Sequence, residues 1–219
     1  MKNQYRILYS LMYLPLVITL ILLPFFPKQI PAHYDAAGNI TRWGSKLELL
    51  IIPFFTIIFG YFMLAMVRYF NKKSNQDGNE KAIILITAGS VLVFDIMCFI
   101  FLYKAYFTAK GINEPIHIDI SQLMFIITGI SLCFIGSIMP KCKLNSIVGL
   151  RTTWSMANEK AWALSQRYGG ISLILGGIVL VIFNLFLTGI PSLIFSMIIF
   201  LIIIIICIII SYVSYKKSM

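Results

Sequence analysis

The sequence of 219 residues is 59% hydrophobic and only 12% charged. Soluble domains carry about 25% charged residues, so this composition excludes an ordinary soluble protein. The formal net charge of +10 would suggest nucleic acid binding in a soluble protein. Here the basic residues lie in loops and tails, where membrane topology explains them better, and we expect no direct binding of nucleic acid.

Six apolar runs are each long enough for a transmembrane helix, which needs about 20 residues. In chain order, the expected helices cover residues 7–26, 47–70, 82–106, 120–139, 170–187 and 193–212. The first run is expected to remain as an uncleaved helix, because no small-x-small cleavage site follows it. We therefore expect an all-α, polytopic membrane protein with six transmembrane helices.

The orientation follows from the Lys and Arg residues, which favour the cytoplasmic side of short loops. With a cytoplasmic N-terminus, five of the 18 basic residues lie outside, which leaves 13 inside. The outer five are Lys28, Arg42, Lys46, Lys104 and Lys110. Both termini are therefore expected in the cytoplasm. We also expect one integral membrane domain, made of a two-helix unit (1–70) and a four-helix unit (71–219).

The first outer loop, residues 27–46, reads PKQIPAHYDAAGNITRWGSK. Pro31 keeps the chain extended as it leaves the first helix, and Asp35 and Gly38 favour turns. Trp43 suits the membrane interface, where Lys46 can extend its ammonium group toward water. These residues predict an ordered extracellular loop that folds against the membrane surface.

Two His-x-Asp pairs lie on the expected outer side, at His33 and Asp35 and at His117 and Asp119. Together they could bind a divalent metal through imidazole nitrogen and carboxylate oxygen. The alternative is that His33 hydrogen-bonds the loop backbone and His117 is incidental. We favour this alternative and expect no metal and no cofactor.

The third helix contains one acidic residue, Asp95, in the middle of an apolar run. A carboxylate at this depth costs on the order of 2.5–3.5 kcal/mol on insertion scales. The residue is interpreted either as a proton or ion site or as a structural hydrogen-bond partner of a neighbouring helix, where Ser131 lies at similar depth.

Small residues on one face let transmembrane helices approach closely. Gly129 and Gly136 on the fourth helix share a face, as do Gly170 and Gly177 on the fifth. These helices are expected to form the bundle interior. The sixth helix, with its run LIIIIICIII, is expected to have no polar or small face and to meet lipid.

The segment 140–168, expected in the cytoplasm, is polar and basic. Asn158 can cap a helix that starts at Glu159, carries Trp162 and runs into the fifth apolar run. The segment is interpreted as a basic loop with an interfacial helix, or as a docking surface for a cytoplasmic partner or an anionic headgroup. Arg151 is the best candidate for such a surface, because a guanidinium binds anions bidentately.

Enzyme signatures such as HExxH, GxSxG and a phosphate-binding glycine loop are absent from the sequence. We therefore expect a protein that is not an enzyme.

Two patterns stand out in the loops of this sequence. The outer loop has Ile-Pro-x-His, then a Gly, then Trp-Gly-Ser-Lys, and the inner segment has Asn-x-x-x-Gly-x-Arg-Thr-x-Trp, then Asn-Glu and a second Trp. Both patterns resemble hallmarks of the SdpI family of six-helix bacterial membrane proteins. The outer residues that the resemblance highlights are Pro31, His33, Gly38, Trp43, Gly44 and Lys46. The inner ones are Asn145, Gly149, Arg151, Thr152, Trp154, Asn158, Glu159 and Trp162.

The resemblance implies a multi-pass immunity protein of the bacterial cell membrane. The family prototype protects a producer cell from its own secreted membrane-active peptide toxin, and it holds a cytoplasmic repressor at the membrane. The implied partners are membrane lipid, a secreted peptide toxin that meets the outer residues, and a cytoplasmic repressor that binds the inner ones. Asp95 is outside the family pattern, so a small proton- or ion-coupled transporter stays as the alternative.

Overall fold

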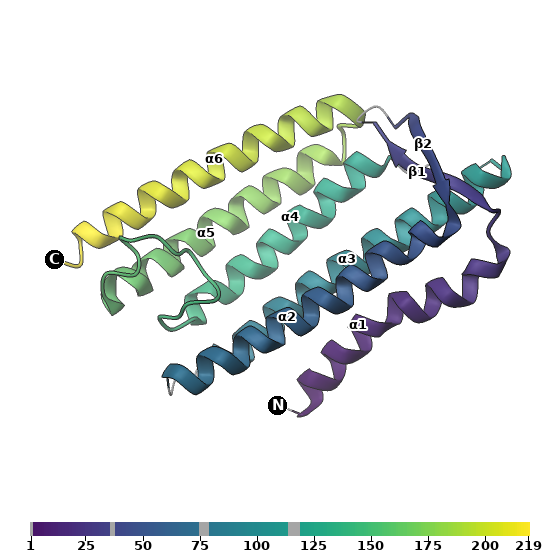
Figure 1. Ribbon diagram of the computed structural model, residues 1–219. Helices are drawn as coiled ribbons and strands as arrows, with labels where there is room; N and C mark the ends of the chain where they lie inside the picture. Colours follow the sequence, from purple (N-terminus) through teal and green to yellow (C-terminus); the bar gives the residue numbers. More distant parts are fainter. Residues whose placement is uncertain (1, 36–37, 75–78, 114–118) are drawn as a thin grey trace.

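The computed structural model describes residues 2–35, 38–74, 79–113 and 119–219, which form a bundle of long helices (Figure 1). The long helices are α1 (Lys2–Leu22), α2 (Ile51–Ser74), α3 (Glu80–Lys110), α4 (Ile120–Ile138), α5 (Glu159–Asn184) and α6 (Gly189–Lys216). Within the described residues, six helices are long and apolar enough to cross a membrane. The predicted all-α, multi-pass fold is confirmed.

Most of the helices extend beyond the apolar runs that predict them. The largest extension is in α5, which begins at Glu159 rather than at residue 170. Asn158 caps this helix, because its Oδ1 accepts the backbone N–H of Ala161 at 2.8 Å. The predicted cap is thus confirmed, and the polar helix and the apolar run are one continuous helix.

The two termini lie at the same end of the bundle, which we call the terminal end, and a β-hairpin covers the opposite, hairpin end (Figure 1). A buried cluster at the terminal end joins α2, α3, α4 and α5 through Val67, Ile83, Ile138 and Trp162. The division into a two-helix and a four-helix unit stays a prediction. The end that faces the cytoplasm is treated below as part of the proposed function.

The closest helix packing joins α4 to α5, and it depends on the predicted glycines. A Cβ atom on Gly136 would lie 2.5 Å from the carbonyl oxygen of Gly170. A Cβ atom on Gly129 would lie 2.7 Å from the carbonyl oxygen of Gly177. No side chain fits between backbones at these distances, so the small residues are what allow the contact.

Helix α6 corrects one expectation. Its outer surface is rich in exposed Ile and Leu, in agreement with a lipid-facing helix. However, it also has a buried face of small polar residues, made of Ser192, Ser196, Cys207, Ser211 and Ser214. The expectation of no small face was wrong because the serines flank the run LIIIIICIII instead of interrupting it.

The loop after α1 is a two-stranded antiparallel hairpin, formed by β1 (Gln29–Tyr34) and β2 (Ile40–Ser45). The register pairs Gln29 with Ser45 and Pro31 with Trp43, and it is irregular around His33. Ile30 is fully buried and packs in a cluster with Leu102 and Ala105 of α3. The sequence predicted an ordered loop but no strands, and the buried side chain of Ile30 packs the hairpin against the bundle.

Candidate functional site

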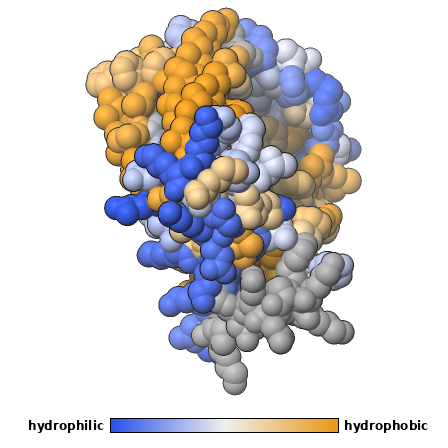
Figure 2. Space-filling view, turned by 90° about the vertical axis from the view of Figure 1, so that its left-hand side faces the viewer, coloured by the Kyte–Doolittle hydropathy of each residue, from blue (hydrophilic) through white to orange (hydrophobic). Residues whose placement is uncertain are grey.

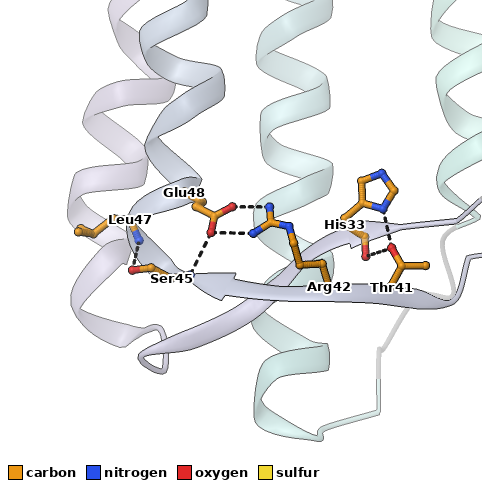
Figure 3. A network of polar contacts seen from close by, with 6 residues as sticks. All are labelled: His33, Thr41, Arg42, Ser45, Leu47 and Glu48. Atoms are coloured by element: carbon orange, nitrogen blue, oxygen red, sulfur yellow. Dashed lines mark hydrogen bonds and ion pairs between the residues drawn. The ribbon is translucent and has the colours of Figure 1, made fainter.

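The base of the hairpin is held by an ion pair and a helix cap (Figure 3). The guanidinium of Arg42 donates to both oxygens of the Glu48 carboxylate, at 3.1 and 2.6 Å. The same carboxylate accepts the backbone N–H of Ser45, whose hydroxyl accepts the N–H of Leu47 at 3.3 Å. This is a capping box, and it fixes the angle between β2 and the short 3-10 helix η2 (Lys46–Leu50).

Two motif residues connect the hairpin to the neighbouring chain. A Cβ atom on Gly44 would collide with the Glu48 carboxylate and lie 2.8 Å from the Cβ of Ala32, so only glycine fits there. The ammonium group of Lys46 donates to the carbonyl oxygen of Leu23 at 3.1 Å. Lys46 therefore joins the second transmembrane segment to the end of the first, instead of extending freely toward water.

The tip of the hairpin is organised by its own side chains. His33 Nδ1 lies 2.5 Å from the hydroxyl of Thr41, which in turn donates to the His33 carbonyl oxygen (Figure 3). Asp35 accepts the backbone N–H of Asn39 at 2.8 Å and its side-chain amide at 3.0 Å. Trp43 is 50% exposed. His33 is thus an exposed, loop-organising residue, and Trp43, which pairs with Pro31 in the hairpin, offers an exposed aromatic surface.

The metal alternative receives no geometric support. His117 lies outside the described residues, so its distance to His33 is not tested. Asp119 caps α4 through the N–H of Gln122 and also accepts the N–H of Gly189. Across the described ranges, no three His, Cys, Asp or Glu side chains lie close enough to hold a metal ion.

Residues 140–158, which we call the motif segment, connect α4 to α5 at the terminal end, and amide and indole groups hold their backbone. The Trp162 indole, 2% exposed, donates to the carbonyl oxygen of Cys142 at 2.7 Å. Burial at this point raises the pKa of the Cys142 thiol. The side chain of Asn79 bonds both backbone groups of Lys143, at 3.1 and 2.8 Å. Asn145 accepts two N–H groups of the following turn.

The centre of the motif segment is fixed by Gln166, which is fully buried in α5. Its amide accepts the N–H of Leu150 and donates to the Leu150 carbonyl oxygen, each at 2.9 Å. Gly149 precedes this contact with a φ of +110°, and a Cβ there would lie 2.5 Å from Gln166 Oε1. Both the backbone angle and the space require glycine.

The end of the motif segment is joined to α6. The hydroxyls of Thr152 and Ser211 are hydrogen-bonded, and Asn158 Nδ2 donates to Ser218 at 3.0 Å. The ring of Trp154 packs edge-on against Tyr212, with centroids 5.3 Å apart. Thr152, Trp154 and Asn158 therefore position the motif segment against the last helix.

Two charged residues of the inner motif take no part in these side-chain contacts. Arg151 and Glu159 are exposed, and among the residues that the structure describes neither side chain has a hydrogen bond or ion pair. The inner motif thus consists of residues that hold the motif segment in place and of two exposed charges, Arg151 within the segment and Glu159 at the start of α5.

Asp95 is 1% exposed on α3. Within the described part of the chain, neither of its carboxylate oxygens has a hydrogen-bond partner. Ser131 donates to the carbonyl oxygen of Ile127 at 2.8 Å instead, one turn back on its own helix. The predicted bond between Asp95 and Ser131 was therefore wrong, because a transmembrane serine satisfies its hydroxyl locally.

Sequence reasoning missed several residues of these sites. Glu48 had a signal, since it follows Ser45 by three positions, as in a capping box. No local signal in the sequence marks Asn79 or Gln166. Asn79 bonds backbone that is 64 positions away, and Gln166 bonds backbone that is 16 positions away.

Comparison with known proteins agrees with this architecture. Residues 141–213 match the model of the SdpI/YfhL protein family, and residues 11–57 match a domain of unknown function, DUF1648. The chain is 24% identical over 206 residues to "Immunity protein SdpI" of Bacillus subtilis (strain 168), which covers 93% of this chain and 92% of that protein. No solved structure matches. The chain is therefore a multi-pass membrane protein that is similar to the SdpI/YfhL family in residues 141–213.

Proposed function

We propose that this protein is a membrane immunity protein that protects its cell from a secreted, membrane-active peptide toxin, and that it has no enzymatic activity. The observation that carries the proposal is the similarity to an immunity protein along 93% of the chain. The hairpin and the motif segment, which contain the two motifs, are both ordered elements at opposite ends of the bundle (Figure 1).

The proposed orientation places the hairpin end outside the cell, and the excess of basic residues on the other side supports it. A peptide that arrives from outside would meet the hairpin first. Its exposed surface includes His33 and Trp43, whereas Gly44 and Lys46 hold its shape. We infer that His33 and Trp43 serve the toxin-facing role, whereas Gly44 and Lys46 maintain the fold of the hairpin.

The terminal end would face the cytoplasm and bind a protein partner, which we propose to be a transcriptional repressor. Figure 2, which views this end, shows hydrophilic side chains gathered over it and hydrophobic ones on the flank. The motif segment supplies Arg151 as an exposed cation on a backbone held by buried hydrogen bonds. A rigid, positively charged surface suits an acidic patch on a partner.

The experiment is survival of toxin-sensitive cells that express the protein, compared with cells that contain an empty vector. The challenge is the secreted peptide toxin of the family prototype, followed by peptides of the same class. Protection should fall with His33→Ala and remain with Arg151→Ala, because only the first residue lies at the hairpin end. Equal survival with protein and empty vector for every peptide would refute the immunity role.

A second candidate function is a small proton- or ion-coupled transporter, and it is favoured by the burial of Asp95, whose carboxylate has no hydrogen-bond partner among the described residues. Such a carboxylate in a transmembrane helix is a default candidate for ion or proton binding. The variant Asp95→Asn keeps the shape of the side chain and removes its charge. If protection is unchanged in this variant, the transporter is excluded as the basis of immunity.

A further inference from the structure

A groove of about 690 Å³ runs along the lipid-facing flank between α5 and α6. Its walls are aliphatic, with Leu175 on α5 and Ile202 and Ile206 on α6. The side chain of Ile203, which is 7% exposed, packs directly over Gly176, where a Cβ atom would lie 2.3 Å from its Cδ1, and both residues line the groove. None of the residues that line this groove belongs to either motif.

The lining changes character toward the terminal end. There the groove is bordered by Lys217, Ser214 and Tyr168. The neighbouring Lys216 has a different contact, since its ammonium group lies 5.0 Å from the centroid of the Tyr212 ring. Lys217 is thus a cation at the open end of an otherwise apolar channel.

We propose that this groove binds one anionic phospholipid, with an acyl chain between α5 and α6 and the phosphate at Lys217. The lining on α6 runs from Ile199 to Lys217, which at 1.5 Å per residue is about 27 Å. One leaflet of the hydrocarbon core is about 15 Å thick. An extended acyl chain therefore fits inside the groove while its headgroup stays at the membrane surface.

Charge complementarity favours an anionic phospholipid over a second copy of the protein in this groove. An apolar helix of a second copy in the same groove would cover Lys217 without pairing its charge, which is unfavourable. An anionic headgroup pairs that charge, and the Tyr168 ring is an interfacial side chain beside it. Only the assignment to the inner leaflet depends on the proposed orientation of the protein.

The test measures lipid binding to the purified full-length protein by native mass spectrometry in detergent. Phosphatidylglycerol and phosphatidylcholine with identical acyl chains are titrated separately. We expect Lys217→Gln to weaken phosphatidylglycerol binding about fivefold, as for the loss of one cation near an anionic surface. The matched control, Lys216→Gln, makes the same charge change next to the groove and should leave binding unchanged.

A second pair of variants tests the acyl-chain channel. Ile206→Trp places a large ring in the groove and should abolish binding of both lipids. Ile204→Trp makes the same change on an exposed part of α6 outside the lining and should not. Equal affinity of the wild-type protein for both lipids, or equal losses in the two lysine variants, would overturn the proposal. A change in oligomeric state with Ile206→Trp, without loss of lipid, would show that a second copy occupies the groove.

Discussion

Replacing Gln166 with Leu removes the side-chain amide that holds the centre of the motif segment. Two hydrogen bonds of 2.9 Å to Leu150 are lost. The Leu150 carbonyl oxygen still accepts the hydroxyl of Ser155 at 2.8 Å, but its N–H is left without a partner. Net hydrogen bonds contribute about 1 kcal/mol each, and an orphaned buried donor adds to the loss. The free energy of local opening should fall by on the order of 2–3 kcal/mol.

Hydrogen exchange of the backbone amides in residues 147–156 measures this opening directly. A loss of that size corresponds to exchange that is about 30- to 150-fold faster, at about 1.4 kcal/mol per factor of ten. Gln122→Leu is the matched control, since it removes a single 3.4 Å bond near the hairpin end. If exchange in residues 147–156 is unchanged in Gln166→Leu, or is accelerated equally by the control, the reasoning is refuted.

Three further predictions concern the hairpin, the helix packing and Asp95. Glu48→Ala should lower the thermal stability more than Arg42→Ala, because Glu48 also accepts a backbone N–H, and equal effects would contradict this. Gly136→Ala should cost about 1–3 kcal/mol in unfolding assays, because its Cβ meets a backbone carbonyl. Gly60→Ala meets a flexible methionine and should cost less, so the reverse order would argue against the α4–α5 contact. Asp95→Asn should leave survival under toxin unchanged, and loss of protection would favour the transporter.

The helices were predictable because each is a local pattern. The apolar runs are long, the cap at Asn158 precedes an acidic first turn, and the α4 and α5 glycines recur at a spacing that shares one face. The strands were not predictable in the same way. The hairpin packs on the bundle through Ile30, whose cluster partners Leu102 and Ala105 on α3 lie some 70 residues further along the chain.

For the candidate site, the sequence singled out the motif residues but not the contacts that they make. The motif in residues 145–162 contains mostly groups that bond backbone or pack on α6, which only the tertiary structure shows. The residues that bond the motif segment from elsewhere in the chain, Asn79, Gln166 and Ser211, carry no local signal because they act through distant contacts. Arg151 was singled out for its guanidinium, and the structure leaves it exposed.

The central claim is that the hairpin and the motif segment face opposite sides of the membrane, with the hairpin outside. It can be tested with Asn39→Cys at the hairpin tip and Met219→Cys at the 85% exposed C-terminus. Intact cells are treated with a membrane-impermeant maleimide, and the unsubstituted protein gives the background of its native cysteines. We predict that Asn39→Cys is labelled in intact cells and Met219→Cys only after lysis. Labelling of Met219→Cys in intact cells, with Asn39→Cys protected until lysis, would contradict it.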